Sequence, residues 1–236
     1  MRAYFVSDIH LSEQSHKLTA AFLDLLNDCK DKCSHFFILG DLFEIWIGDD
    51  VESEFVNKIK SGLLDFTTNG PETFIMHGNR DFLIGEKFSK DTGVKIIPDP
   101  FEFNFNNEKV LLSHGDALCI DDTDYINFRN QVRNTKWQND FLNKSIEERE
   151  NIAAKLRDDS NDATQNKSME ITDVNATAVK QILDTYSPDV FVHGHTHRPN
   201  IHDDETIKRI VLGDWGDQGW YLTLDEYGYN LNKFQI

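Results

Sequence analysis

Cysteine and proline are scarce in this sequence, and no long apolar run occurs. The 236 residues include 5 prolines and only three cysteines, Cys29, Cys33 and Cys119, with no Cys-x-x-Cys pair. A small, odd number of cysteines argues against a disulfide framework and fits a reducing compartment. No stretch approaches the ~18 apolar residues that a membrane span needs. The N-terminus also lacks the apolar segment and cleavage site of a signal peptide, so we expect a cytoplasmic protein.

Positive charge is also in short supply. Lys and Arg total 24 against 41 Asp and Glu, which gives a net charge of −17. This balance argues against general binding of nucleic acid, because phosphate neutralisation requires clustered basic residues. It does not exclude a small anionic substrate, because bound metal ions can reverse the local field. With 39% hydrophobic residues, including 17 Phe, the chain has material for a buried core. We expect residues 1–236 to form a single domain and the protein to be a monomer.

Short apolar runs alternate with helical patterns along the chain. Apolar residues repeat at helical spacing over Leu18–Cys29, Phe55–Leu64 and Val179–Tyr186. This alternation predicts an α/β sandwich, with mixed β-sheets flanked by helices. The last three apolar runs, within 209–232, have no helices between them and predict a β-meander in the second half of the sheet. The five earlier runs predict buried strands: Ala3–Val6, Phe36–Leu39, Thr73–Met76, Val110–Leu112 and Val190–Val192.

The segment from about residue 120 to 168 interrupts this alternation of strands and helices. It is rich in Asn, Asp, Arg and Gln and is compatible with helices, and Ser145 to Glu148 forms a possible capping box. We interpret this segment as a helical insertion that caps the active edge of the sheet. A pair of ordinary surface helices is the alternative.

Each of the five predicted strands is followed by a side chain that can bind metal. In α/β sheets, ligands bind beyond the carboxyl ends of the strands, so we expect these side chains to converge. Carboxylate, amide and imidazole ligands together favour a pair of Mn, Fe or Zn ions over Ca or Mg. Such a pair needs one bridging carboxylate, for which Asp41 is the candidate. The predicted metal ligands are Asp8, His10, Asp41, Asn79, His114, His195 and His197.

These residues stand in five motifs, Asp-x-His, Gly-Asp, Gly-Asn-Arg-Asp, a lone His and Gly-His-x-His. The set resembles the motifs of the calcineurin-like metallophosphoesterases. The resemblance implies that family's sandwich fold, with a helical lid insertion, and a site for two divalent ions, typically Mn²⁺. It places one ion between Asp8, His10, Asp41 and His197. It places the other between Asp41, Asn79, His114 and His195.

The stretches around the motifs are most similar to family members that act in lipid A biosynthesis. These stretches are Gly40–Asp50, His77–Leu83, His114–Asp122 and His193–Pro199. The resemblance implies a UDP-sugar lipid as substrate: water attacks the α-phosphorus of UDP-2,3-diacylglucosamine and releases UMP and 2,3-diacylglucosamine 1-phosphate. It also implies peripheral contact with the cytoplasmic face of the inner membrane. The implied catalytic residues are Asp41, Asn79, Arg80 and His195. The implied substrate contacts are Asn79, Arg80, Asp122, Ser160, Thr164, Lys167 and His195.

Arg80 stands where many phosphoesterases of this kind have a histidine. Arginine stays charged and cannot donate a proton near neutral pH, but it suits bidentate binding of phosphate oxygens. A phosphate leaving group, whose second pKa is ~6, needs little help from a general acid. Arg80 therefore favours a diphosphate substrate. The alternatives are another nucleotide diphosphate, a phosphodiester, or a non-catalytic scaffold that has lost its metals. The scaffold predicts replaced ligands, and all seven are present.

The remaining charged and aromatic residues can be interpreted in more than one way or as surface charge. Glu44, Asp81 and Asp116 either orient metal ligands or cap loops, and Asp49 and Asp50 are expected to be solvated loop charge. In the insertion, four basic residues can face an anionic head group: Arg149, Lys155, Arg157 and Lys167. Four apolar residues line an acyl-chain groove, lie on a membrane surface or pack as ordinary helix residues: Phe128, Trp137, Phe141 and Leu142.

Overall fold

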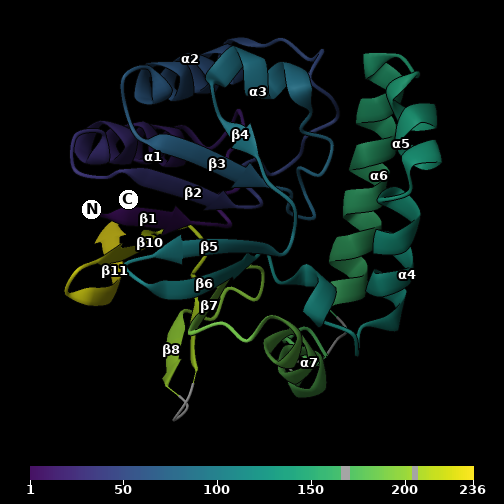
Figure 1. The fold of residues 1–236 in the computed structure, drawn as a ribbon. Helices are drawn as coiled ribbons and strands as arrows, with labels where there is room; N and C mark the ends of the chain where they lie inside the picture. The colour runs from purple at the N-terminus through teal and green to yellow at the C-terminus, as the bar shows by residue number, and fades with distance from the viewer. Residues whose placement is uncertain (166–170, 204–206) are drawn as a thin grey trace.

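The computed structural model describes residues 1–165, 171–203 and 207–236, without the side chains of 158–165. Two β-sheets pack face to face (Figure 1). The first has the strand order β11 (Gly228–Gln235), β10 (Gln218–Asp225), β1 (Ala3–Val6), β2 (His35–Leu39), β3 (Glu72–Met76) and β4 (Lys95–Ile96). The second has the order β5 (Phe101–Phe105), β6 (Glu108–Ser113), β7 (Val190–His193), β9 (Lys208–Val211) and β8 (Asn200–Asp203).

Helices cover the outer faces of both sheets. Figure 1 shows α1 (His16–Cys29), α2 (Glu54–Thr67) and α3 (Glu86–Thr92) over the first sheet and α7 (Ala176–Tyr186) beside the second. The predicted α/β class with mixed sheets is therefore confirmed, and each of the five earlier strand predictions corresponds to a strand. Within the described residues, no helix has the length and hydropathy needed to cross a bilayer.

The predicted placement of the C-terminal strands is wrong. β9 lies in the second sheet, where it pairs in parallel with β7, whereas β10 and β11 belong to the first sheet. The chain crosses between the sheets after Val211, and β10 then pairs antiparallel with β1, with Phe5 opposite Leu222. Hydrophobic periodicity identifies strands but does not specify their partners, so the sequence pattern could not reveal this crossing.

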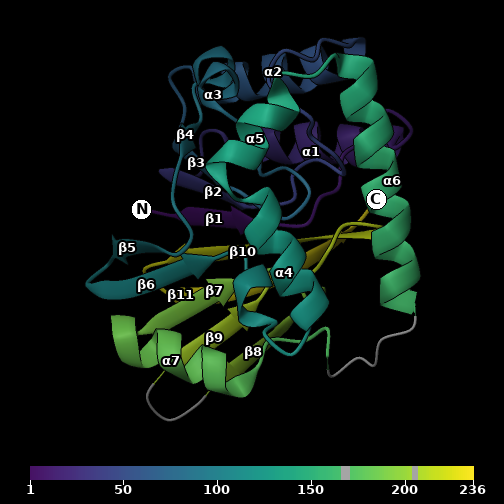
Figure 2. The same ribbon diagram turned by 90° about the vertical axis from the view of Figure 1, so that its right-hand side faces the viewer.

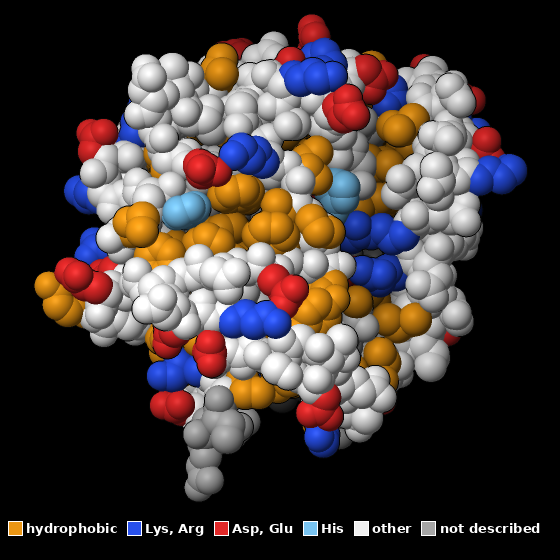
Figure 3. Space-filling model, in the orientation of Figure 1, with side chains coloured by type: hydrophobic (Ala, Val, Ile, Leu, Met, Phe, Trp, Pro, Cys, Tyr) orange, Lys and Arg blue, Asp and Glu red, His pale blue; other side chains and the backbone are white. Residues whose placement is uncertain are grey.

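The core explains why the strand sequences are apolar on both faces. Along β1, Ala3 and Phe5 point into the cluster between the two sheets, and Tyr4 and Val6 pack with the helical layer. Such burial on both faces is typical of the parallel strands in an α/β protein. Figure 3 shows a band of hydrophobic side chains across the middle of one face of the molecule.

Three further helices stand beside the edge at which the parallel strands end. They are α4 (Thr123–Val132), α5 (Thr135–Leu142) and α6 (Ile146–Gln165), and Figure 2 shows them in front of that edge. The capping box forms: Ser145 N–H donates to Glu148 Oε2 at 2.9 Å, and Glu148 N–H donates to Ser145 Oγ at 3.3 Å. We call α4–α6 the cap helices.

Candidate metal centre

The seven predicted metal ligands lie in the loops that follow five strands. Asp8 and His10 follow β1, Asp41 follows β2 and Asn79 follows β3. His114 follows β6 in the second sheet, and His195 and His197 follow β7. Gly194 N–H donates to the His114 carbonyl at 2.9 Å, and Asp8 N–H donates to the Gly40 carbonyl at 3.1 Å, so neighbouring loops are joined by backbone hydrogen bonds. Across the two sheets, the His195 N–H donates to Asp8 Oδ2 at 2.9 Å, so both sheets contribute to one site.

Five of these residues have a left-handed backbone conformation, with φ between 52° and 67°. They are Asp8, His10, Asp41, His195 and His197. Each such residue costs about 1–3 kcal/mol and persists only where the surrounding structure holds it. The concentration of this strain in the ligand loops is characteristic of a functional site.

One group of ligand atoms combines Asp8, His10 and His197, which can hold a metal ion together. His10 Nε2 and His197 Nε2 are 3.4 Å apart, and His197 Nε2 lies 3.4 Å from Asp8 Oδ1. Asp8 is fully buried, and its Oδ1 has no hydrogen-bond donor within the described part of the chain. A buried carboxylate oxygen without a donor is costly unless a cation compensates it, so this group fits a metal ion.

A second group combines Asp8, Asp41 and His114. His114 Nε2 lies 3.8 Å from Asp41 Oδ2 and 3.0 Å from Asn79 Oδ1, and His195 Nδ1 lies 2.9 Å from the same Asn79 oxygen. The Leu39 carbonyl, 2.9 Å from His114 Nδ1, can only accept, so Nδ1 carries a hydrogen and Nε2 is the nitrogen that faces the site.

The electrostatics of this second group call for positive charge. Burial alone would lower the pKa of His114, but the carboxylates of Asp41 and Asp8 raise it to about 9. Burial raises the pKa of Asp41 to about 6. These carboxylates thus hold a proton on His114, at the position where a divalent cation would supply the charge instead. Asp8 is shared by the two groups, and the bridging role of Asp41 stays a prediction.

Asp81 orients two of the ligand loops. Its fully buried carboxylate accepts hydrogen bonds from the backbone N–H groups of Gly78 at 2.9 Å, Leu42 at 2.8 Å and Asp41 at 3.3 Å. Asp41 Oδ1 in turn accepts from the Arg80 N–H at 2.8 Å. A Cβ on Gly78 would overlap the Asp41 carboxylate, so this close approach requires glycine.

The predicted substrate contacts are only partly brought together. Asn79, Arg80 and His195 lie at the site, whereas Asp122 caps α4, with its Oδ1 accepting from Tyr125 N–H at 3.0 Å. The side chains of Ser160 and Thr164 and all of Lys167 lie outside the described residues. The sequence interpretation missed Tyr125 as a site residue, although its ring stacks on His195 with centroids 5.8 Å apart.

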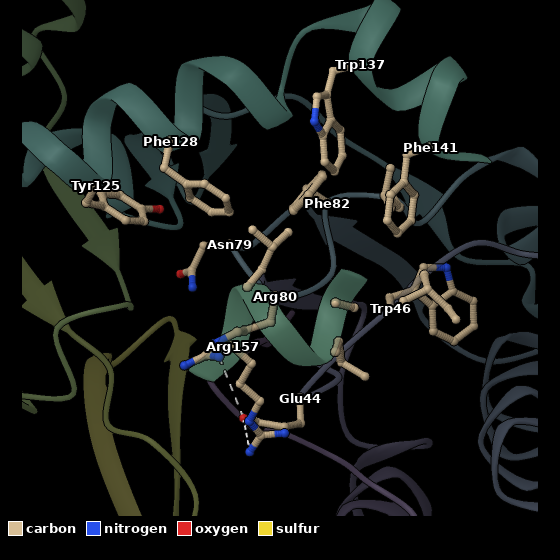
Figure 4. Close-up of a pocket in the computed structure, with 15 residues that line it drawn as sticks. Glu44, Trp46, Asn79, Arg80, Phe82, Tyr125, Phe128, Trp137, Phe141 and Arg157 are labelled. Atoms are coloured by element: carbon tan, nitrogen blue, oxygen red, sulfur yellow. Dashed lines mark ion pairs between the residues drawn. The ribbon is translucent and has the colours of Figure 1, made fainter. Parts of the chain in front are cut away.

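A largely apolar pocket lies between the metal centre and the cap helices (Figure 4). Asn79 and Arg80 form part of its lining, together with Phe128, Trp137 and Phe141 from the cap. Several residues of the pocket lining were not predicted as site residues. The signal that could have identified them is the apolar sequence just after the Gly-Asp and Gly-Asn-Arg-Asp motifs: Ile45, Trp46, Ile47, Phe82 and Leu83.

Leu142 is 39% exposed and is absent from the lining of this pocket, which argues against the groove alternative for this residue. Two expectations about individual side chains are wrong. Arg149 is buried instead of facing a head group: it donates to the Ile47 carbonyl at 2.7 Å and to both oxygens of Asp50. Asp49 is not solvated loop charge either, because it accepts hydrogen bonds from Trp46 Nε1 at 3.1 Å and from the Phe88 N–H at 2.9 Å.

Comparison with known proteins places this geometry in context. The family model described as calcineurin-like phosphoesterase matches residues 1–199. UDP-2,3-diacylglucosamine hydrolase of Haemophilus influenzae (strain PittGG) is 42% identical over 227 residues, covering 96% of each chain. The enzyme of the same name from Pseudomonas fluorescens (strain Pf0-1) is 42% identical over 235 residues, covering 98% of this chain and 95% of its own. Among solved structures, an archaeal phosphodiesterase has a similar fold, with a TM-score of 0.53, 13% identity and complete coverage of both chains.

Proposed function

This chain belongs to the calcineurin-like phosphoesterase family, and on that premise we propose that it hydrolyses the pyrophosphate bond of UDP-2,3-diacylglucosamine to UMP and 2,3-diacylglucosamine 1-phosphate. The observation that carries the proposal is the continuity of the candidate metal centre with an apolar pocket. Asn79 belongs to both, and Arg80 lies where they meet. A substrate with a diphosphate at one end and acyl chains at the other matches this succession of polar and apolar surfaces.

We further propose that the centre takes two Mn²⁺ ions, one held by Asp8, His10, Asp41 and His197 and the other by Asp41, Asn79, His114 and His195. When bound, the ions would lower the pKa of the attacking water and stabilise negative charge on the phosphoryl oxygens. The chain itself orients the substrate. The guanidinium of Arg80 can bind two phosphate oxygens, while its backbone N–H fixes Asp41 Oδ1. The leaving phosphate needs little protonation, so the absence of a histidine at position 80 is tolerated.

The substrate also suggests how the protein meets the membrane. We propose that it is a monomer that contacts the cytoplasmic face of the inner membrane peripherally and draws the acyl chains into the pocket beneath the cap helices. Since the net charge of −17 opposes adsorption to anionic lipids, this contact would depend on the acyl chains. Flotation with vesicles that contain or lack the lipid substrate tests it, and light scattering tests the monomer.

Turnover of UDP-2,3-diacylglucosamine with and without Mn²⁺ tests the function directly, with release of UMP as the readout. We expect Asp41→Ala and Arg80→Ala each to reduce turnover by about 100-fold or more. Arg2→Ala is the matched control, because Arg2 pairs with Asp225 at the amino end of β1, at the opposite end from the site. Rapid hydrolysis of an unrelated phosphodiester, without turnover of this lipid by the unaltered protein, would contradict the substrate but not the family.

A further inference from the structure

Glu44 joins three parts of the site through one carboxylate. Its Oε2 lies 3.0 Å from His10 Nδ1, and its Oε1 lies 2.7 Å from a terminal nitrogen of Arg157 and 3.8 Å from one of Arg80. The two arginines approach Glu44 from α6 and from the loop after β3 (Figure 4). Only 18% of the Glu44 side chain is exposed, so these contacts are partly shielded from water.

The first contact fixes the orientation of a predicted metal ligand. Because Nδ1 of His10 faces Glu44, the other ring nitrogen, Nε2, points toward His197 at 3.4 Å and completes the group with Asp8. A carboxylate on the far nitrogen of a ligating histidine sets both the tautomer and the plane of the ring. His10 also has a left-handed backbone, which gives the loop a second reason to need a fixed side chain.

The second contact holds an arginine of the cap over the pocket. The Arg157 side chain is 44% exposed, and a long side chain with that freedom would occupy several rotamers without a partner. Paired with Glu44, Arg157 lies in the pocket lining with Asn79 and Arg80. Two guanidinium groups against one carboxylate leave net positive charge beside the apolar pocket, as an anionic head group requires.

We propose that Glu44 is a positioning residue for the hydrolysis: it orients His10 for metal binding and, independently, places Arg157 to bind the anionic part of the substrate. This inference rests on the proposed function. The two roles use different oxygens of one carboxylate, so a single variant can separate them.

Glu44→Gln is that variant. A glutamine keeps one side-chain oxygen that can lie against His10 Nδ1, but it presents an NH₂ group to Arg157 in place of the second oxygen. Glu44→Ala removes both contacts. Glu150→Gln is the matched control, because it removes the same negative charge at an exposed position of α6, the helix that carries Arg157.

Metal binding tests the first role without any substrate. Calorimetric titration of the metal-free protein with Mn²⁺ should show about 10–100-fold weaker binding for Glu44→Ala, the usual effect of losing such a partner. Glu44→Gln should retain most of the affinity, and Glu150→Gln should match the unaltered protein. If Glu44→Ala binds Mn²⁺ as the unaltered protein does, the role toward His10 is wrong. If the unaltered protein binds no Mn²⁺, the proposed function itself fails.

Steady-state kinetics at saturating Mn²⁺ test the second role. Arg157→Ala and Glu44→Gln should each raise KM for UDP-2,3-diacylglucosamine about 3–10-fold with little change in kcat. The KM of the double variant should be no higher than that of either single variant, because both substitutions remove the same contact. A simple charge effect predicts the opposite for Glu44→Gln, since losing a negative charge would lower KM for an anion. A lower KM, or additive effects in the double variant, would overturn the placement of Arg157 by Glu44.

Discussion

The ion pair between Arg149 and Asp50 joins α6 to the loop after β2. Removing one partner should destabilise the protein more than removing the other. Arg149 is 1% exposed, whereas the Asp50 side chain is 59% exposed. Removing the carboxylate, in Asp50→Ala, leaves a buried guanidinium that still donates to the Ile47 carbonyl but has lost its ion pair. An uncompensated buried charge of this kind costs about 3–5 kcal/mol.

Removing the arginine is the milder change, although Arg149 is the more buried residue. In Arg149→Met the apolar stem is retained and water can solvate the exposed Asp50 carboxylate, so the lost ion pair costs about 0–1 kcal/mol. The Ile47 carbonyl loses its donor, which adds about 1–3 kcal/mol. We therefore expect about 1–4 kcal/mol for Arg149→Met, below the value for Asp50→Ala.

Urea unfolding at fixed Mn²⁺ measures both free energies of unfolding, and hydrogen exchange of the α6 amides shows whether the helix loosens first. Lys155→Ala, which alters an exposed residue of the same helix, is the control. The reasoning is refuted if Arg149→Met destabilises the protein more than Asp50→Ala, or if both variants unfold at the same urea concentration as the control.

Three further predictions concern the pocket, a buried thiol and the metal. Phe128→Ser should reduce kcat/KM for the diacyl lipid about tenfold, as expected for about 1.4 kcal/mol of lost apolar contact. The same variant should change kcat/KM for a short-chain diphosphate analogue less than twofold. Equal losses on both substrates would contradict an acyl groove. Burial raises the pKa of Cys119 to about 12, so at pH 8 about one thiol in ten thousand is ionised, against about a quarter for a free cysteine. Alkylation followed by peptide mapping should therefore find Cys119 protected in the native protein and reactive in urea. Chelation should lower Tm and added Mn²⁺ should restore it, because a ligand at 1,000 times Kd stabilises the folded state by roughly 4 kcal/mol. An unchanged Tm in calorimetry would speak against a site that binds the folded state selectively.

The convergence of the candidate metal ligands could be predicted from the sequence better than the pairings around them, for a physical reason. Parallel strands that lie side by side bring their carboxyl ends to one edge, so Asp8, Asp41 and Asn79 could be placed together from strand prediction alone. The side-chain pairings of Arg149 and Asp50 could not be found in this way. They lie 99 residues apart, and nothing in a local charge pattern distinguishes a solvated aspartate from one that neutralises a buried arginine. The crossing of the chain from β9 in the second sheet to β10 in the first was hidden for the same reason, because strand pairing is a long-range property.

If it acts on an anionic lipid, as we propose, this strongly acidic protein must reverse its own field locally, and the arrangement of carboxylates shows how. Asp8 and Asp41 are almost completely buried at the centre, where they attract cations and are screened from the surface. Glu44 lies between that centre and the pocket and is paired with His10, Arg80 and Arg157. The negative charge of Glu44 is thus matched by cationic groups on both sides. The same carboxylates that make the site suitable for metal are therefore prevented from repelling the diphosphate.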